Sequence, residues 1–222
     1  MAQICLQLAW NPTDVEGFLA RARMADEAGA HSVWVNEGFG HDAFSGLALL
    51  ARETGRVRLG TSIVNVFSRT PGALAQHFAT IDQLSGGRVL VGLGVSSAGV
   101  AGRFHGVPFE RPMVRLRETV ELLRLYWRKE RFSYQGRVFS IDRALAMGVD
   151  PVQLEPPVFL ATLAPRSVAL TARIADGWLP AWIPHDRLGP VGRSRRGHRH
   201  AGKDALTGLM ASPCRPGGDM RE

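Results

Sequence analysis

Two side chains that could exchange protons with a substrate stand directly after one predicted strand. Glu37 follows the strand that we expect over residues 32–36, and His41 lies in the adjoining loop. A carboxylate and an imidazole at a strand end can act as general acid or base, and partial burial can tune their pKa values. Spacing alone also allows a simpler interpretation, in which Glu37 caps or pairs locally and His41 is solvated. Glu37 is the first choice for proton handling and His41 the second.

A glycine-containing segment, VGLGVSSAG at residues 91–99, could approach a ligand with its backbone. A dinucleotide fingerprint needs a third glycine where Ser97 stands, so that motif fails. Gly92 is predicted to serve strand packing. Gly94 and the hydroxyls of Ser96 and Ser97 lie nearer the rim of the predicted site.

A candidate anion site is the segment Leu163-Ala164-Pro165-Arg166. It supplies a loop, a proline suited to the first turn of a helix, and a guanidinium, and helix N-termini favour anions. Arg69, Arg103 and Arg111 are further candidates, although a surface role is the simpler interpretation of each.

The elements that must position these residues alternate between strand and helix. Short apolar runs predict strands over residues 4–10, 32–36, 57–66, 89–94, 158–163 and 178–183. Helical periodicity and caps predict helices between them, and a hairpin-like pair spans residues 131–141. Apolar strands that each precede a helix require a parallel sheet covered by helices. The pattern does not decide whether that sheet is open or closed into a barrel.

Composition narrows the class of protein. The chain has 222 residues, of which 45% are hydrophobic, and its formal net charge is +7. Residues 185–222 hold eight Lys or Arg and four Asp or Glu, so the remaining body is nearly balanced and a nucleic-acid partner is not expected. Cys5 and Cys214 suggest neither a disulfide framework nor a metal site. No signal peptide and no apolar run of about 18 residues is visible, which predicts no membrane partner and a cytoplasmic setting.

The order of these segments resembles the luciferase-like monooxygenase superfamily, in particular its branch that uses the deazaflavin coenzyme F420. The resemblance covers residues 3–184. Its matching segments are SVWVNEGFGHDAF, VRLGTSIVNVFSRTPGALAQHFATIDQLSGGRVLVGLG, HGVPFERP and ARIADGWLP. The long second segment is the specific one.

The resemblance implies an α/β fold, a (β/α)8 TIM-type barrel with a flavin or deazaflavin at the carboxyl ends of its strands. A non-prolyl cis peptide at Ser62-Ile63 would support the ring, with Asn65 nearby. Strand-two ligands would be Asn36 and Glu37, where the family often has Asp-His. The resemblance implies further cofactor contacts in the later strands and loops, at Gly94, Ser96, Ser97, Thr162, Leu163, Ala164 and Trp182.

The chain departs from this family in length, because complete barrels of this type have about 250 residues. We therefore expect an incomplete barrel of about six strands over residues 1–184. Residues 185–222, rich in Arg, Gly and Pro, are expected to form an irregular, disordered tail. The change of character after Pro184 resembles a truncated or frameshifted reading frame.

The implied function is transfer of a hydride between F420 and a small organic substrate. One alternative is a monooxygenase that uses reduced FMN and O2. Another is a truncated fragment without catalytic activity. The sequence names no substrate and leaves open whether the chain forms a homo-oligomer.

Overall fold

The computed structural model describes residues 3–180, so Trp182 and the predicted tail lie outside the described residues. The elements alternate as predicted. The strands are β1 (Cys5–Leu8), β2 (Ser32–Val35), β3 (Arg58–Thr61), β4 (Val64–Asn65), β5 (Val89–Gly94), β6 (Tyr134–Gln135), β7 (Ser140–Ile141), β8 (Val158–Ala161) and β9 (Gly177–Trp178). The α-helices are α1 (Val15–Glu27), α2 (Ala43–Glu53), α3 (Pro71–Ser85), α4 (Pro112–Trp127) and α5 (Pro165–Ile174). A 3-10 turn, η1 (Pro12–Asp14), and a π-helix, η2 (Val100–Phe104), complete the set.

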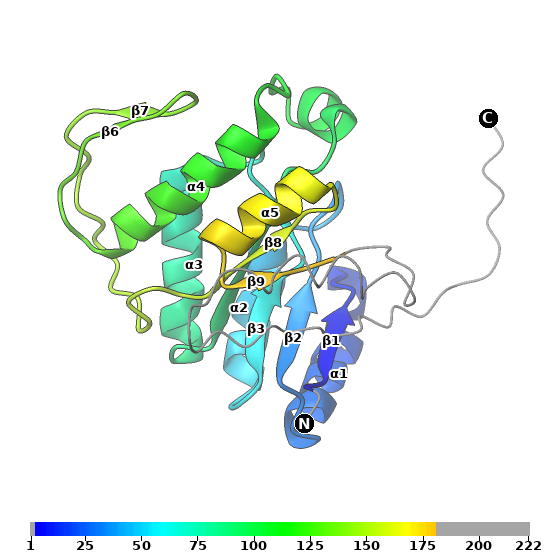
Figure 1. The fold of residues 1–222 in the computed structure, drawn as a ribbon. Coiled ribbons are helices and arrows are strands. Elements are labelled where there is room, and N and C mark those ends of the chain that lie inside the picture. Colours follow the sequence, from blue (N-terminus) through cyan, green and yellow to red (C-terminus); the bar gives the residue numbers. More distant parts are fainter. Residues whose placement is uncertain (1–2, 181–222) are drawn as a thin grey trace, which may run out of the picture.

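The main sheet is parallel throughout and curled, like half of a TIM barrel (Figure 1). Its strand order is β1-β2-β3-β5-β8-β9, and β4 pairs with β5 beside that path. From β1 to β8, each strand of this sheet is followed in the chain by a helix, except where β3 continues into β4. The small hairpin β6–β7 stands apart from the sheet. The prediction of an incomplete (β/α) barrel of about six strands is confirmed.

The helices begin where the sequence provides caps. Asp42 accepts a hydrogen bond from the Ser45 N–H at the start of α2 (2.9 Å), and Thr70 accepts one from the Ala73 N–H at the start of α3 (3.2 Å). Such caps satisfy N–H groups that have no partner within the helix. The two caps fix where α2 and α3 leave the carboxyl ends of their strands.

Successive side chains along each strand point to opposite faces of the sheet, and both faces are apolar. The outer face packs against the helices through side chains such as Val33, Val91 and Leu160. The inner face carries a smaller buried cluster made of Cys5, Trp34, Leu90, Phe159 and Leu179. Burial on both faces explains why the strands read as continuous apolar runs.

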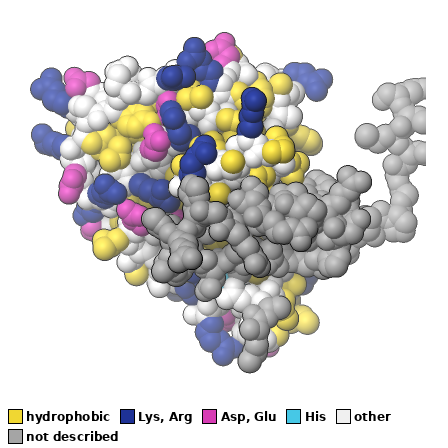
Figure 2. Space-filling view, in the orientation of Figure 1, with side chains coloured by type: hydrophobic (Ala, Val, Ile, Leu, Met, Phe, Trp, Pro, Cys, Tyr) yellow, Lys and Arg dark blue, Asp and Glu magenta, His cyan; other side chains and the backbone are white. Residues whose placement is uncertain are grey.

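The visible surface carries charges of both signs. In Figure 2 the basic and acidic side chains are interspersed on that face, with hydrophobic side chains between them. No helix within residues 3–180 is long and apolar enough to cross a membrane.

Candidate active site

The carboxyl ends of the strands place the predicted residues side by side. Asn65 of β4 pairs with Gly94 of β5, and Gly94 pairs with Ala161 of β8. Adjacent strands lie about 4.8 Å apart, so these three residues form one row across the sheet. Thr162 is the next residue along the chain after Ala161, just beyond the end of β8. The sequence prediction that these strand ends meet at one edge is confirmed.

The third predicted strand is divided into β3 and β4 by a cis peptide bond between Ser62 and Ile63. The prediction of a non-prolyl cis bond at this position is confirmed. β3 pairs with both β2 and β5, whereas β4 pairs with β5. We call residues 61–66 the platform segment.

The hydroxyl of Thr61 closes the gap that this division leaves in the ladder. It donates to the Gly92 carbonyl (2.7 Å) and accepts from the Gly92 N–H (3.0 Å). A Cβ on Gly92 would lie 1.6 Å from the Thr61 carbonyl oxygen, so only glycine allows this approach. Gly94 likewise makes room for Ile63, because a Cβ added at Gly94 would lie 2.9 Å from the Ile63 side chain.

Two buried polar atoms of the platform segment have no hydrogen-bond partner among the described residues. They are Ser62 Oγ and Asn65 Nδ2. The other amide atom of Asn65, Oδ1, accepts a hydrogen bond from the Phe67 N–H at 2.8 Å and so fixes the orientation of the amide. Leaving a buried polar group unpaired costs about 1–3 kcal/mol, so such atoms point to a ligand that supplies the partner.

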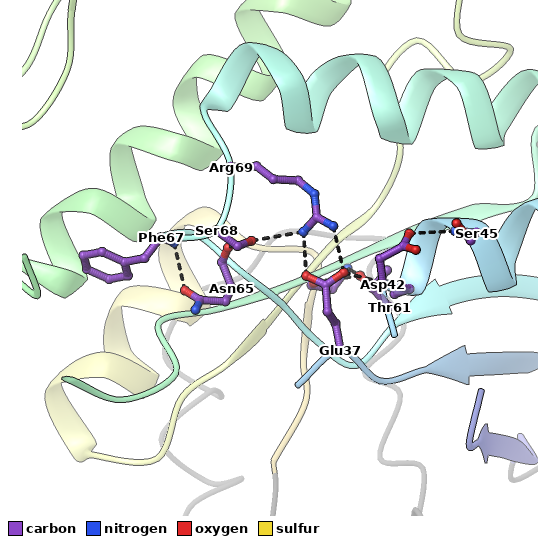
Figure 3. A network of polar contacts seen from close by, with 10 residues as sticks. Glu37, Asp42, Ser45, Thr61, Asn65, Phe67, Ser68 and Arg69 are labelled. Atoms are coloured by element: carbon purple, nitrogen blue, oxygen red, sulfur yellow. Dashed lines mark hydrogen bonds and ion pairs between the residues drawn. The ribbon is translucent and has the colours of Figure 1, made fainter. Parts of the chain in front are cut away.

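Glu37 makes a two-pronged ion pair with Arg69, which follows the platform segment (Figure 3). Arg69 Nη1 lies 2.5 Å from Oε1 and Nη2 lies 2.9 Å from Oε2. The side chains of Arg69 and Glu37 are 19% and 9% exposed. The Ala43 N–H also donates to Glu37 Oε2 at 3.0 Å. The local pairing that spacing alone allowed for Glu37 is therefore present.

Arg69 also contacts residues other than Glu37. Its Nη1 donates to Ser68 Oγ (3.0 Å), and its guanidinium lies over the Phe44 ring at 5.0 Å. Phe44 in turn stacks on His77, with 4.7 Å between the ring centroids. Burial, helped by the positive charge of Arg69, lowers the pKa of His77. The ion pair thus joins the end of β2, the start of α2 and the platform segment.

His41 lies on the exposed side of the same region. Its ring faces Trp10 edge-on, with 6.3 Å between centroids, and Trp10 packs on Phe18 at 5.0 Å. Its neighbour Asp42 caps α2. Burial alone would raise the pKa of Asp42, but the hydrogen bonds from Ser45 and the charge of Arg69 lower it overall.

The remaining predicted cofactor contacts differ in their exposure at the carboxyl edge of the sheet. Asn36, Ser96, Ser97, Leu163 and Ala164 are exposed, and Ser96 has a positive φ of 57°. Ser97 Oγ accepts a hydrogen bond from the Val100 N–H (3.3 Å) at the start of η2. Thr162 is buried and its hydroxyl is shared with Thr171 of α5 (2.8 Å), so its side chain turns toward that helix.

Sequence reasoning assigns too little to Arg69 and Thr61. A surface role is the simpler interpretation of Arg69 in the sequence, but its guanidinium is largely buried. A signal for the ion pair was present, because Glu37 follows β2 and Arg69 lies in the segment that continues from β3, the parallel neighbour of β2. Residues 3–180 contain no group of three His, Cys, Asp or Glu side chains that could hold a metal ion.

Comparison with known proteins identifies a family and several relatives of this chain. The model of the luciferase-like monooxygenase family matches residues 7–213. A Mycobacterium tuberculosis protein named as a coenzyme F420-dependent oxidoreductase is 36% identical over 79% of this chain and 54% of its own length.

Two solved structures show the same fold. A monooxygenase from Streptomyces bottropensis is 26% identical, with a TM-score of 0.76 over 87% of this chain and 65% of its own. The coenzyme F420-dependent tetrahydromethanopterin reductase from Methanopyrus kandleri is 23% identical, with a TM-score of 0.72 over 81% and 55%.

The chain spans about half the length of the curated relatives it matches. The family match nevertheless covers most of its residues, and it includes the whole row of strand ends at the candidate site. On this match the chain belongs to the luciferase-like monooxygenase family.

Proposed function

We propose that this protein binds coenzyme F420 at the platform segment and transfers a hydride between that coenzyme and a small organic substrate. The observation that carries the proposal is the pair of unpartnered buried atoms, Ser62 Oγ and Asn65 Nδ2, on a segment at the carboxyl edge of the sheet. The name of the M. tuberculosis relative supports F420 as the coenzyme.

The residues present suit a flat ring with polar edges. Ser62 Oγ and Asn65 Nδ2 would hydrogen-bond to it, and Ile63 would give apolar contact between them. Gly94 leaves the space that the Ile63 side chain occupies. The deazaflavin, when bound, supplies or accepts the hydride, while the protein orients the ring and excludes water.

The outer parts of the coenzyme would meet the exposed predicted contacts. Asn36, Ser96 and Ser97 are proposed to hydrogen-bond near the ring. The segment from Thr162 to Ala164 leads into the N-terminus of α5, which has no side-chain cap, and is proposed for the phosphate. Trp182 is proposed for the same region from the sequence alone.

Glu37 and His41 are proposed to manage the proton that accompanies the hydride. Both Glu37 oxygens already accept hydrogen bonds, so Glu37 could take up a proton only after Arg69 moves. His41 is exposed and sterically accessible. We therefore expect His41→Gln to lower kcat about 100-fold or more without changing F420 affinity, as is usual for a lost general acid or base. An unchanged kcat for His41→Gln would remove it from this role.

A second candidate is a monooxygenase that uses reduced FMN and O2. The name of the Streptomyces structure supports a monooxygenase reaction. Titration of the purified protein with F420 and with FMN, followed by cofactor fluorescence, distinguishes the two. We expect tighter binding of F420. Tighter binding of FMN would favour the monooxygenase, and a folded protein that binds neither would favour the fragment without catalytic activity.

A further inference from the structure

The side chain of Arg115, in the first turn of α4, is a partly buried cation without a polar partner. Within residues 3–180 its guanidinium makes no hydrogen bond or ion pair, and its Nε is buried. Burial lowers the pKa of Arg115, although an arginine stays charged. A charge in this position costs free energy unless other contacts offset the loss of water.

Two aromatic rings provide those contacts. The guanidinium carbon of Arg115 lies 4.7 Å from the centroid of the Phe67 ring and 5.0 Å from the centroid of the Phe139 ring. A cation over the face of an aromatic ring is attracted by the ring, and the planar guanidinium can also stack on it. Arg115 therefore joins Phe139, in the turn between β6 and β7, to Phe67, which directly follows the platform segment.

Both rings are held by further contacts. The Phe139 N–H donates to Glu118 Oε2 of α4 at 3.1 Å, so the hairpin is fixed to the helix that carries Arg115. Phe67 is buried and stacks on Phe109, with 4.9 Å between the ring centroids and an interplanar angle of 29°. The Phe67 ring thus packs against groups from α4 and from the loop before it.

The backbone of Phe67 controls the amide of Asn65. The Phe67 N–H donates to Asn65 Oδ1 at 2.8 Å (Figure 3). Only the oxygen of an amide side chain can accept, so this hydrogen bond decides which way Nδ2 points. The Ser68 N–H (3.1 Å) and Ser68 Oγ (2.7 Å) donate to the Asn65 carbonyl, which closes a tight turn over residues 65–68. A shift of Phe67 would therefore turn the Asn65 amide.

We propose that Arg115 is a positioning residue of the coenzyme site. By stacking on Phe67 and Phe139 it keeps the Phe67 N–H against Asn65 Oδ1, and so keeps Asn65 Nδ2 in the orientation that binds F420. This rests on the proposed function for the identity of the coenzyme. The orientation of the amide is a property of the protein without coenzyme and is tested without it.

The test compares Arg115→Met and Arg115→Lys with the wild type in two measurements. NMR follows the side-chain amide signals of Asn65 without coenzyme; the chain has three asparagines, and Asn65→Ser assigns these signals. Fluorescence titration measures F420 affinity. Arg115→Met is expected to shift or broaden the Asn65 signals and to weaken F420 binding about tenfold. Arg115→Lys keeps the charge without the planar group and should weaken binding about threefold.

A double-mutant cycle tests whether the hairpin acts through Arg115. Phe139→Leu removes the second ring and is expected to weaken F420 binding about threefold. The double variant Phe139→Leu/Arg115→Met should bind F420 no more weakly than Arg115→Met alone, because the effect of Phe139 passes through the guanidinium. Independent, additive losses would contradict this link.

The matched control is Arg124→Met on the same helix, which breaks the pair with Asp176 (3.4 Å). It should leave the Asn65 signals unchanged and F420 affinity within twofold. An equal loss of affinity in Arg124→Met would overturn the proposal, because the effect would then follow the stability of α4.

Unchanged Asn65 signals and F420 affinity in folded Arg115→Met would overturn the proposal as well. If Arg115→Met does not fold, Arg115→Lys and Phe139→Leu decide by the same two measurements. Asn65 signals that depend on Arg115 in a protein that does not bind F420 would reject the proposed function alone.

Discussion

The Glu37–Arg69 pair is the polar contact that determines how the candidate site is held together. Glu37 looked like a proton carrier because an acid after a strand is common in active sites. In the structure its oxygens bind a guanidinium and a helix N–H, so Glu37 positions these groups as long as the pair with Arg69 is intact. The partner could not be found from local sequence, because 32 residues separate the two positions.

We expect Arg69→Met to lower the free energy of unfolding by about 2 kcal/mol, since it leaves the largely buried Glu37 carboxylate without its counter-charge. It should also weaken F420 binding, because the loop after the platform segment loses its anchor. Urea unfolding and F420 titration measure the two effects.

The matched control is Arg21→Met, which breaks the exposed pair with Asp14, whose side chains are 50% and 58% exposed. Exposed pairs contribute about 0–1 kcal/mol. Equal stability of the Arg69 and Arg21 variants would contradict the anchoring role.

At the scale of single elements, the sequence predicted the buried strands well and the interrupted one less well. β5 has the predicted bounds, Val89–Gly94, because a short apolar run directly after the turn at Gly86-Gly87 is typical of a strand buried on both faces. The strand predicted over residues 57–66 is two strands, because the break depends on tertiary pairing that apolar periodicity does not encode. Only the resemblance to a family indicated the cis bond.

Substitutions of Thr61 test which of its contacts stabilises the junction between β3 and β4. Thr61→Val keeps the shape but leaves both the N–H and the carbonyl of Gly92 without the hydroxyl, so we expect a loss of about 2 kcal/mol in the free energy of unfolding. Thr61→Ser keeps the hydroxyl and should lose less than half as much. Chemical denaturation compares them, and a serine variant no better than the valine variant would show that methyl packing dominates.

Glu118 of α4 gives the fold a pH-dependent contact. Its buried carboxylate accepts hydrogen bonds from the N–H groups of Arg137 (2.7 Å), Val138 (3.0 Å) and Phe139 (3.1 Å) in the β6–β7 hairpin. Burial alone would raise the pKa of Glu118, but these hydrogen bonds and the charge of Arg117 lower it below the ordinary value.

A lowered pKa in the folded state stabilises the protein at pH values above the unfolded pKa of about 4.3, and this stabilisation is lost as the pH falls through the folded value. We expect Glu118→Gln to be less stable than wild type by about 2 kcal/mol at pH 7. The difference should shrink below about pH 4. Urea unfolding from pH 7 to pH 3 measures it, and a difference independent of pH would contradict a role for the charge.

At the scale of the whole molecule, alternating strands and helices were enough to predict a parallel sheet with helices against it. They were not enough to decide between an open and a curled sheet, because curvature arises from register and twist between strands. The described sheet ends at β1 and β9, and its carboxyl edge carries the row from Asn65 to Ala161. That edge is where the proposed coenzyme would bind.

The most direct test of the central claim is a crystal structure of this protein with F420 bound. The account predicts that Ser62 Oγ and Asn65 Nδ2 each lie about 2.7–3.2 Å from a polar atom of the deazaflavin. A coenzyme bound elsewhere, with both atoms still lacking a partner, would contradict it.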